Sequence, residues 1–85
     1  MSRPVTVRIY TKARCPLCDE ARAVLADLAA RVSFTLEEVD IRSSQEAWAR
    51  LRYKVPVVEV DGEVVSTLRV DAAMLAHRLG GTPIA

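Results

Sequence analysis

Hydrophobic residues occupy every second position from Val5 to Ile9 and alternate with Thr6, Arg8 and Tyr10. Successive side chains of a strand point to opposite faces, so this period of two predicts a half-buried β-strand. Residues 11–14 follow as a loop.

From Pro16 onward, apolar residues recur at spacings of three and four, which is typical of one face of a helix. Charged residues such as Asp19, Asp27 and Arg31 fall on other faces. The pattern predicts an amphipathic helix that ends near Arg31. Its apolar positions are Leu17, Ala21, Val24, Leu25, Leu28 and Val32.

Residues 33–40 read as a second strand, with Phe34, Leu36 and Val39 as its apolar content. A strand, a helix and a strand in this order imply a parallel pair joined by a right-handed crossover.

Ser43 and Glu46 have the spacing of a capping box, which predicts a short helix that continues to about Arg52. Within it, we expect Trp48 to pack in the core or against a helix rather than to act as a binding platform.

Two further strand-like runs, residues 57–60 and 63–66, are joined by Asp61-Gly62, a strong signal for an antiparallel hairpin. Glu59 falls in the third strand, where a buried carboxylate would need a partner. Lys54 and the arginines are candidates, but we expect this side chain to lie in water at a strand edge.

Asp71 is expected to cap a last helix, with Val70 placed to pack on Leu75 and Gly80 placed to end the helix. We expect residues 81–85 to form a loose tail. The order βαβαββα predicts an α/β fold with a four-stranded mixed sheet, strand order 2-1-3-4, and helices on both faces. Residues 1–85 would form a single domain.

The composition narrows the classes of partner. A formal net charge of +1 offers no electrostatic basis for binding nucleic acid or an anionic membrane. No apolar run approaches the ~20 residues of a membrane span, and the start, Met-Ser-Arg-Pro, has no hydrophobic signal region. We therefore expect a cytoplasmic monomer, in a compartment where a cysteine pair is more often catalytic or metal-binding than structural.

The only two cysteines, Cys15 and Cys18, stand at the predicted start of the first helix. Residues at i and i+3 meet on one face of a helix, so their sulfurs can close and reopen a short disulfide. Chain-entropy stabilisation grows with the length of the closed loop, so such a bridge is better suited to exchange than to stapling.

Pro16 fits the first helical position, which places Cys15 at the N-cap. There its thiolate can accept from the amides of Leu17 and Cys18 and is stabilised by the helix dipole. Such settings lower a thiol pKa from ~8.5 to roughly 3.5–7.5. We predict Cys15 as the nucleophile and Cys18 as the resolving thiol.

Two other interpretations of the pair remain open. A zinc site needs about four ligands, and besides these cysteines the chain offers only His77 as a typical zinc ligand. We therefore expect no metal. The second interpretation is that the two cysteines lie close together by chance and have no redox role. The position of the cysteines between a strand and a helix argues against this interpretation.

The chain resembles the glutaredoxin branch of the thioredoxin-like superfamily. The segment VRIYTKARCPLC, from Val7 to Cys18, is similar to the glutaredoxin strand, lysine-bearing loop and Cys-Pro-Tyr-Cys motif, with Leu17 in place of tyrosine. Val55-Pro56 matches the family's Val-Pro. The resemblance implies that Pro56 is cis and faces the active-site sulfurs, and that the Val55 backbone offers N–H and C=O groups to a bound peptide.

One segment departs from the glutaredoxin pattern. Where typical members have Gly-Gly and an acidic residue after the hairpin, this chain has residues 66–71, STLRVD. We expect Ser66 and Thr67 to place Cβ atoms where glutathione would approach, and therefore to weaken its binding. Ser66, Arg69 and Asp71 resemble instead a segment of glutaredoxin-like redoxins that take electrons from thioredoxin reductase.

The function predicted on these grounds is reduction of protein or low-molecular-weight disulfides, with no bound cofactor and with glutathione or thioredoxin reductase as electron donor. The alternatives are a glutathione-dependent carrier of a 2Fe–2S cluster and a redox-silent interaction module. The residues expected in catalysis are Cys15, Cys18, Pro16 and Pro56, and those expected to contact substrate are Lys12, Arg14, Leu17, Val55, Arg69 and Asp71.

Overall fold

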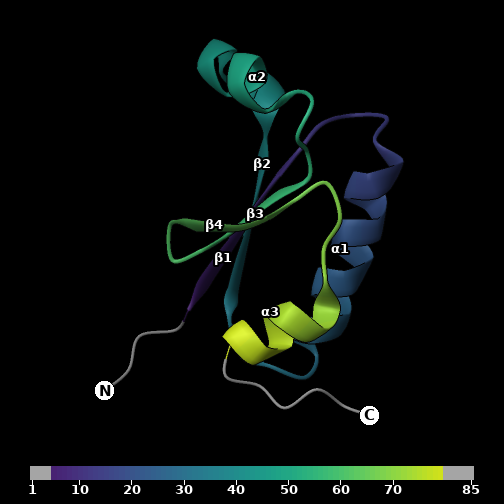
Figure 1. Cartoon of the computed structure of the whole chain (residues 1–85), viewed down its shortest axis with the longest axis vertical. Coiled ribbons are helices and arrows are strands. Elements are labelled where there is room, and N and C mark those ends of the chain that lie inside the picture. The colour runs from purple at the N-terminus through teal and green to yellow at the C-terminus, as the bar shows by residue number, and fades with distance from the viewer. Residues whose placement is uncertain (1–4, 80–85) are drawn as a thin grey trace.

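The computed structural model describes residues 5–79 (Figure 1). Gly80, expected to end the last helix, and the tail expected over residues 81–85 lie outside this range. The elements are β1 (Thr6–Thr11), α1 (Pro16–Ala29), β2 (Thr35–Asp40), the short 3-10 helix η1 (Ile41–Ser43), α2 (Gln45–Leu51), β3 (Val57–Val60), β4 (Glu63–Thr67) and α3 (Ala72–Arg78).

The four strands form one mixed sheet in the order β2-β1-β3-β4, which confirms the predicted topology. β1 pairs with β2 in parallel, whereas β3 is antiparallel to both β1 and β4. The parallel pair has an important consequence for the site, because the carboxyl ends of β1 and β2 meet at the same edge of the sheet. The loop after Thr11 and the turn after Asp40 therefore come together.

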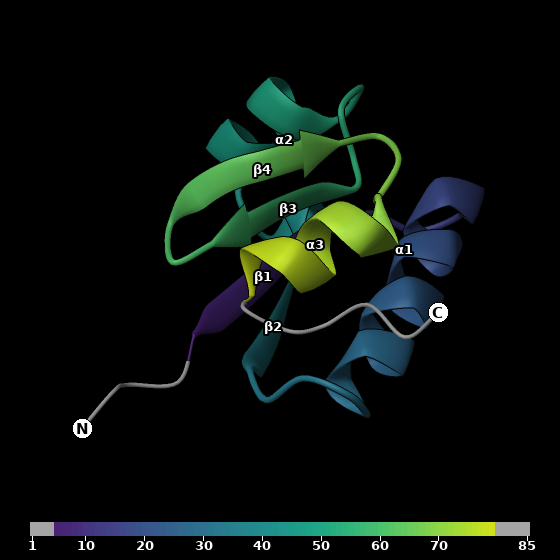
Figure 2. The same cartoon turned by 60° about the horizontal axis from the view of Figure 1, so that its bottom comes forward.

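Helices α1 and α3 cover one face of the sheet (Figure 2). Between them and the sheet lies the larger core, which takes alternate residues of β1 and β3, the apolar stripe of α1, and Leu75 and Ala76 of α3. Val70 packs against this same core, as the sequence predicted. Asp71 caps α3, since its Oδ1 accepts the Met74 amide at 3.1 Å. The members of this core are Val7, Ile9, Ala21, Leu25, Leu28, Val58, Val60, Leu75 and Ala76.

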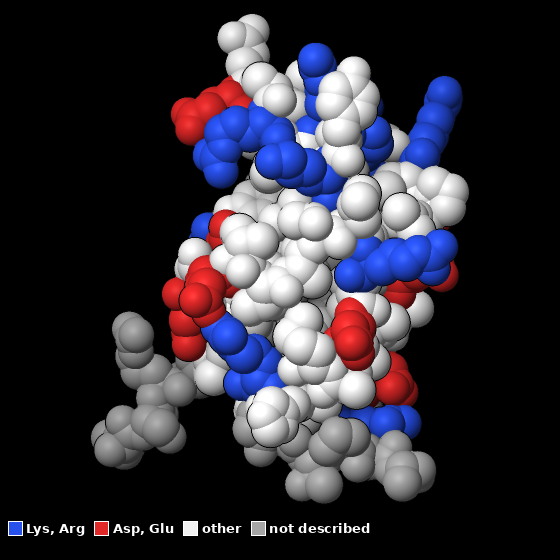
Figure 3. All heavy atoms as spheres, viewed as in Figure 1, with Lys and Arg blue, Asp and Glu red and all other residues white. Residues whose placement is uncertain are grey.

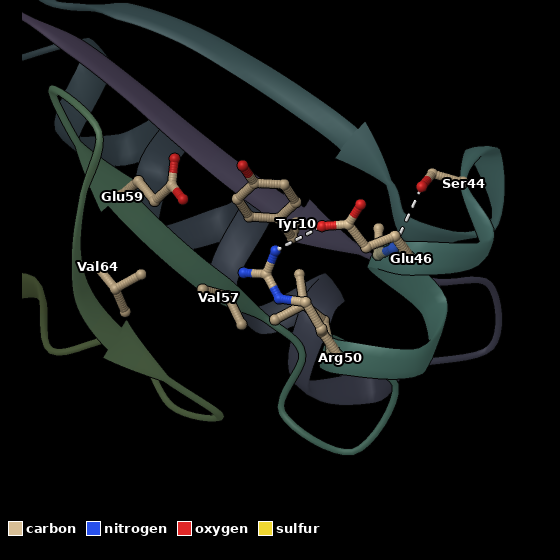
Figure 4. Close-up of a pocket in the computed structure, with 9 residues that line it drawn as sticks. Tyr10, Ser44, Glu46, Arg50, Val57, Glu59 and Val64 are labelled. Carbon is tan, nitrogen blue, oxygen red and sulfur yellow. Dashed lines mark hydrogen bonds and ion pairs between the residues drawn. The ribbon is translucent and has the colours of Figure 1, made fainter.

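Helix α2 lies on the opposite side of the sheet, over the end that carries Tyr10 and Val57 (Figure 4). A shallow pocket of about 250 Å³ separates this helix from the strands. Its floor also includes Glu59, whose side chain is 17% exposed and reaches Arg8 on the neighbouring strand at 4.0 Å. The expectation that Glu59 lies in water at a strand edge is therefore wrong, because β3 is a central strand and the neighbouring β1 supplies a cross-strand cation.

The helix boundaries differ from the predictions in two places. Ser44, not Ser43, caps α2, since its Oγ accepts the Ala47 amide at 3.2 Å. The hydroxyl of Ser43 instead donates to the carbonyl of Asp40, because residues 41–43 form a 3-10 turn that the capping-box spacing did not reveal. Helix α1 ends at Ala29, two residues short of Arg31. The next two N–H groups, those of Ala30 and Arg31, donate to carbonyls three residues back instead of four, which closes the helix with a tighter turn.

Within residues 5–79, no helix combines the length and the apolar character that crossing a bilayer requires.

Candidate functional site

Cys15 and Cys18 are joined by a disulfide at the start of α1, with their Cα atoms 5.2 Å apart. The chain reaches them from β1 through a three-residue loop, and Arg14, directly before Cys15, has a positive φ of 56°. This left-handed residue turns the chain from the strand into the helix. Pro16 is the first helical residue, as predicted. Proline fits this position because a backbone N–H there would have no partner within the helix.

Cys15 is the N-cap of α1, with extended backbone angles. Its sulfur accepts the backbone N–H of Cys18 at 3.1 Å, and its carbonyl accepts that of Asp19, also at 3.1 Å. Of the two amides expected to reach this sulfur, Cys18 does so and Leu17 makes no such bond. A sulfur in this position is directed at the positive end of a fourteen-residue helix, which favours its anionic form.

The two cysteines differ in their exposure to solvent. Cys15 retains 9% of its surface exposed, whereas Cys18 is fully buried. Little of Cys15 is exposed, because a second, smaller apolar cluster closes around the disulfide. That cluster contains Ile41 and Val55, with Tyr10, Leu17, Ala47 and Leu51 packed against it.

The Val55-Pro56 peptide bond is cis, as the family resemblance implied, and Val55 belongs to the cluster around the disulfide. Its backbone differs from the expectation in one respect. The N–H of Val55 donates to the carbonyl of Leu51 at 3.1 Å, because the end of α2 runs directly into this turn. Among the described residues, none donates to the Val55 carbonyl, so only this group is left for a substrate.

Lys12, Arg14, Arg42 and Trp48 line a groove of about 640 Å³ together with Ala13. The ammonium of Lys12 also donates to the carbonyl of Arg52 at 2.9 Å, which ties the loop before Cys15 to the end of α2. Trp48 is 38% exposed, so the prediction that it packs in the core or against a helix is wrong. Arg42 was not singled out from the sequence, although parallel pairing of β1 and β2 already places the turn after Asp40 beside the loop after Thr11.

A smaller hollow of about 90 Å³ lies on the other side of the motif and includes Leu17, Leu68, Arg69 and Val70. Leu17 and Arg69 thus line the same hollow. Asp71 is the cap of α3, and its oxygen is engaged with the Met74 amide.

Ser66 and Thr67, which were expected to obstruct glutathione, lie in the last strand of the sheet. Both are ladder residues of β4, opposite Val58 and Val57. The residue that follows the strand and lines the hollow is Leu68, which has a positive φ of 68°. The hairpin extends one residue further than predicted, because the bulge between Val58 and Glu59 shifts the register.

A polar network anchors the end of β1 beneath the site. Glu38 on β2 accepts from the hydroxyl of buried Thr11 at 2.8 Å and from the guanidinium of Arg22 on α1 at 2.8 Å. The Arg22 hydrogen bonds, and then that of Thr11, hold the pKa of Glu38 below its usual range. The same contact raises the pKa of Arg22.

Within residues 5–79, no three His, Cys, Asp or Glu side chains gather in a cluster that could hold a metal ion.

Comparison with known proteins identifies a family and several structures that this chain is similar to. The family model described as "Glutaredoxin-like domain (DUF836)" matches residues 6–80. Protein Ne2328 from Nitrosomonas europaea superposes with a TM-score of 0.79 at 22% identity, covering 93% of this chain and 95% of that one. A mutant thioredoxin from Halobacterium salinarum gives 0.68 at 20% identity, covering 98% and 79%. The holo form of glutaredoxin C1 from Populus tremula x tremuloides gives 0.56 at 20%, covering 85% and 73%. At these identities the three structures establish the fold alone.

Proposed function

Because this chain belongs to the glutaredoxin-like domain family, and because its cysteines stand at a helix N-terminus, we propose that it is a thiol–disulfide oxidoreductase. Its reduced form would transfer two electrons to the disulfide of a protein or a small molecule.

The reaction uses both cysteines in turn. The thiolate of Cys15 attacks one sulfur of the substrate disulfide, the substrate S–S bond breaks, and the departing sulfur takes up a proton. Cys18 then loses its proton and attacks the Cys15 sulfur of the mixed disulfide, which releases the second substrate thiol. The substrate is reduced to two thiols, and Cys15 and Cys18 are oxidised to the disulfide.

The observation that carries this proposal is the position of the Cys15 sulfur. It caps α1 and accepts the amide of Cys18, and Cys15 retains 9% of its surface exposed, whereas Cys18 is fully buried. This position stabilises a thiolate and leaves part of Cys15 open to an approaching substrate. Cys18, buried directly behind it, is placed to resolve the mixed disulfide but not to meet a substrate first.

Reduction of insulin by the dithiol form tests the proposal. We expect insulin disulfides to be lost in step with oxidation of the protein's own thiols, and no reaction with a variant in which both cysteines are serine. Native protein that reacts no faster than this variant would leave the redox-silent interaction module as the better description.

For the electron donor we propose a protein reductase of the thioredoxin reductase class rather than glutathione. Leu68 presents a side chain where a glycine would let a small peptide approach the backbone, and Arg69 beside it is available to a protein partner. Turnover measured side by side with glutathione plus its reductase and with thioredoxin reductase decides between the two donors. Faster turnover with glutathione would reverse this assignment.

A further inference from the structure

The cations of this protein divide into two groups by position. Within residues 5–79, the arginines that form ion pairs are Arg8, Arg22, Arg31, Arg50 and Arg78. Those residues also include six lysines and arginines that make no ion pair with a described carboxylate. They are Lys12, Arg14, Arg42, Arg52, Lys54 and Arg69.

All six unpaired cations belong to segments at the end of the molecule that carries the Cys15–Cys18 disulfide. They come from the loop before Cys15, the 3-10 turn after β2, the turn before Pro56 and the loop after β4. Figure 3 shows Lys and Arg side chains concentrated toward the end that carries α2 and the start of α1. The net charge of +1 therefore conceals a strongly positive surface around the disulfide.

This surface is hollowed directly beside the motif. The groove of about 640 Å³ is lined by Lys12, Arg14, Arg42 and Trp48, together with Ala13. A second hollow of about 460 Å³ shares Arg42 and Trp48 and is also lined by Ser44 and Gln45, at the start of α2. The two hollows thus have charges and one aromatic ring in their shared lining, and the first includes the residue next to Cys15.

We propose that this groove, defined by Lys12, Arg14, Arg42 and Trp48, docks an acidic segment that flanks the reactive disulfide of a protein substrate. The inference rests on the proposed exchange reaction and specifies its substrate class. Guanidinium and ammonium groups without carboxylate partners suit Asp and Glu side chains, and the exposed face of Trp48 suits the apolar parts of the same segment. A nucleic acid offers the charge but no disulfide for Cys15 to attack.

Two peptides test the docking through the exchange rate. Each carries one cysteine linked to 5-thio-2-nitrobenzoate, and the flanking residues are glutamate in one peptide and glutamine in the other. When Cys15 attacks the peptide sulfur, the coloured thiolate leaves and its absorbance gives the second-order rate constant. We expect the glutamate peptide to react about tenfold faster at low salt, and this advantage to disappear at about 0.5 M salt.

Two variants locate the effect. R42Q should lower the ratio of the glutamate-peptide rate to the glutamine-peptide rate about two- to fivefold. R31Q is the matched control, because it makes the same charge change at the far end of α1, where Arg31 already pairs with Asp27. We expect it to leave the ratio of the two rates unaltered.

The emission of Trp48, the only tryptophan of the chain, reports docking without any exchange. A glutamate-rich peptide that lacks cysteine should change this emission in a salt-sensitive manner, and R42Q should weaken the response. Equal rates for the two peptides, together with unchanged emission, would overturn the inference and leave the exchange reaction standing. Failure of both peptides to react would reject the exchange reaction instead, and the emission titration would still decide whether the groove binds acidic peptide. A stronger, equally salt-sensitive response to an oligonucleotide would assign the groove to nucleic acid and overturn the inference.

Discussion

The backbone N–H of Leu68 donates to the carbonyl of Pro56 at 2.9 Å and, in the same arrangement, to the carbonyl of Lys54 at 3.1 Å. This shared hydrogen bond fastens the loop after β4 to the turn that carries the cis proline. In this arrangement Leu68 has a φ of 68°, a left-handed conformation that an L-residue with a side chain rarely takes. The hollow beside Leu17 is thus shaped by a residue under backbone strain.

Replacing Leu68 by glycine should relieve this strain. The side chain is 45% exposed, so little apolar burial is lost. Leu68→Ala is the matched control, because it removes most of the same side chain but retains the Cβ atom that disfavours positive φ. We expect L68G to exceed L68A in free energy of unfolding by up to about 1 kcal/mol in urea titrations. Equal stabilities of the two variants would mean that the loop relaxes to another conformation.

The same substitution should improve use of glutathione. Removing the Leu68 side chain opens the hollow that Leu17 and Arg69 also line, and allows a small peptide to approach the backbone. We expect L68G to raise the glutathione-coupled rate severalfold, without changing the rate at which iodoacetamide alkylates Cys15. Thr67→Gly serves as the control, since Thr67 is a ladder residue of β4 and should leave the rate unchanged. A rise with T67G but not L68G would restore the original assignment of the obstruction to the strand residues.

The two thiols of the reduced protein should differ in reactivity. Cys15 has exposed surface and accepts an amide N–H, whereas Cys18 is fully buried. At about pH 6, where an unperturbed thiol is almost wholly protonated, we expect iodoacetamide to label Cys15 well before Cys18. Mass spectrometry of the digested protein at successive times measures this order. Faster labelling of Cys18 would exchange the roles of nucleophile and resolving thiol.

The carboxylate of Glu38 should make the stability of the fold depend on pH. Its pKa is lowered in the folded state, so the unfolded chain binds the proton more readily. The resulting stabilisation is fully present above the unfolded pKa of about 4.3, and is lost as the pH falls through the lower folded value. Because the side chain is 42% exposed, we expect Glu38→Gln to cost less than about 1 kcal/mol at pH 6.

Urea unfolding of the native protein and E38Q between about pH 6 and pH 3 measures this contribution. The two free energies of unfolding should converge as the pH falls. A difference that stays constant throughout the series would show that hydrogen bonding of the side chain to Thr11, rather than its charge, stabilises the end of β1.

The sequence by itself determined the order of the elements, the hairpin at Asp61-Gly62, the cap at Asp71 and the position of Cys15 at the start of α1. Each of these depends on residues within a few positions of one another, whose spacing directly expresses the period of a strand, the period of a helix or the geometry of a turn. The parallel pairing of the first two strands followed as well, because a strand, a helix and a strand leave few ways to connect.

The tertiary structure alone decided what surrounds the cysteines. Arg42 and Trp48 lie beside Lys12 because two parallel strands end at one edge of the sheet, and Arg8 faces Glu59 because of the register between β1 and β3. The amide of Val55 is engaged by α2, and Leu68 is held at a positive φ by carbonyls from another turn. These contacts join residues that are far apart in the chain. Packing and strand register bring these residues together, and neither can be predicted from the spacing of neighbouring residues.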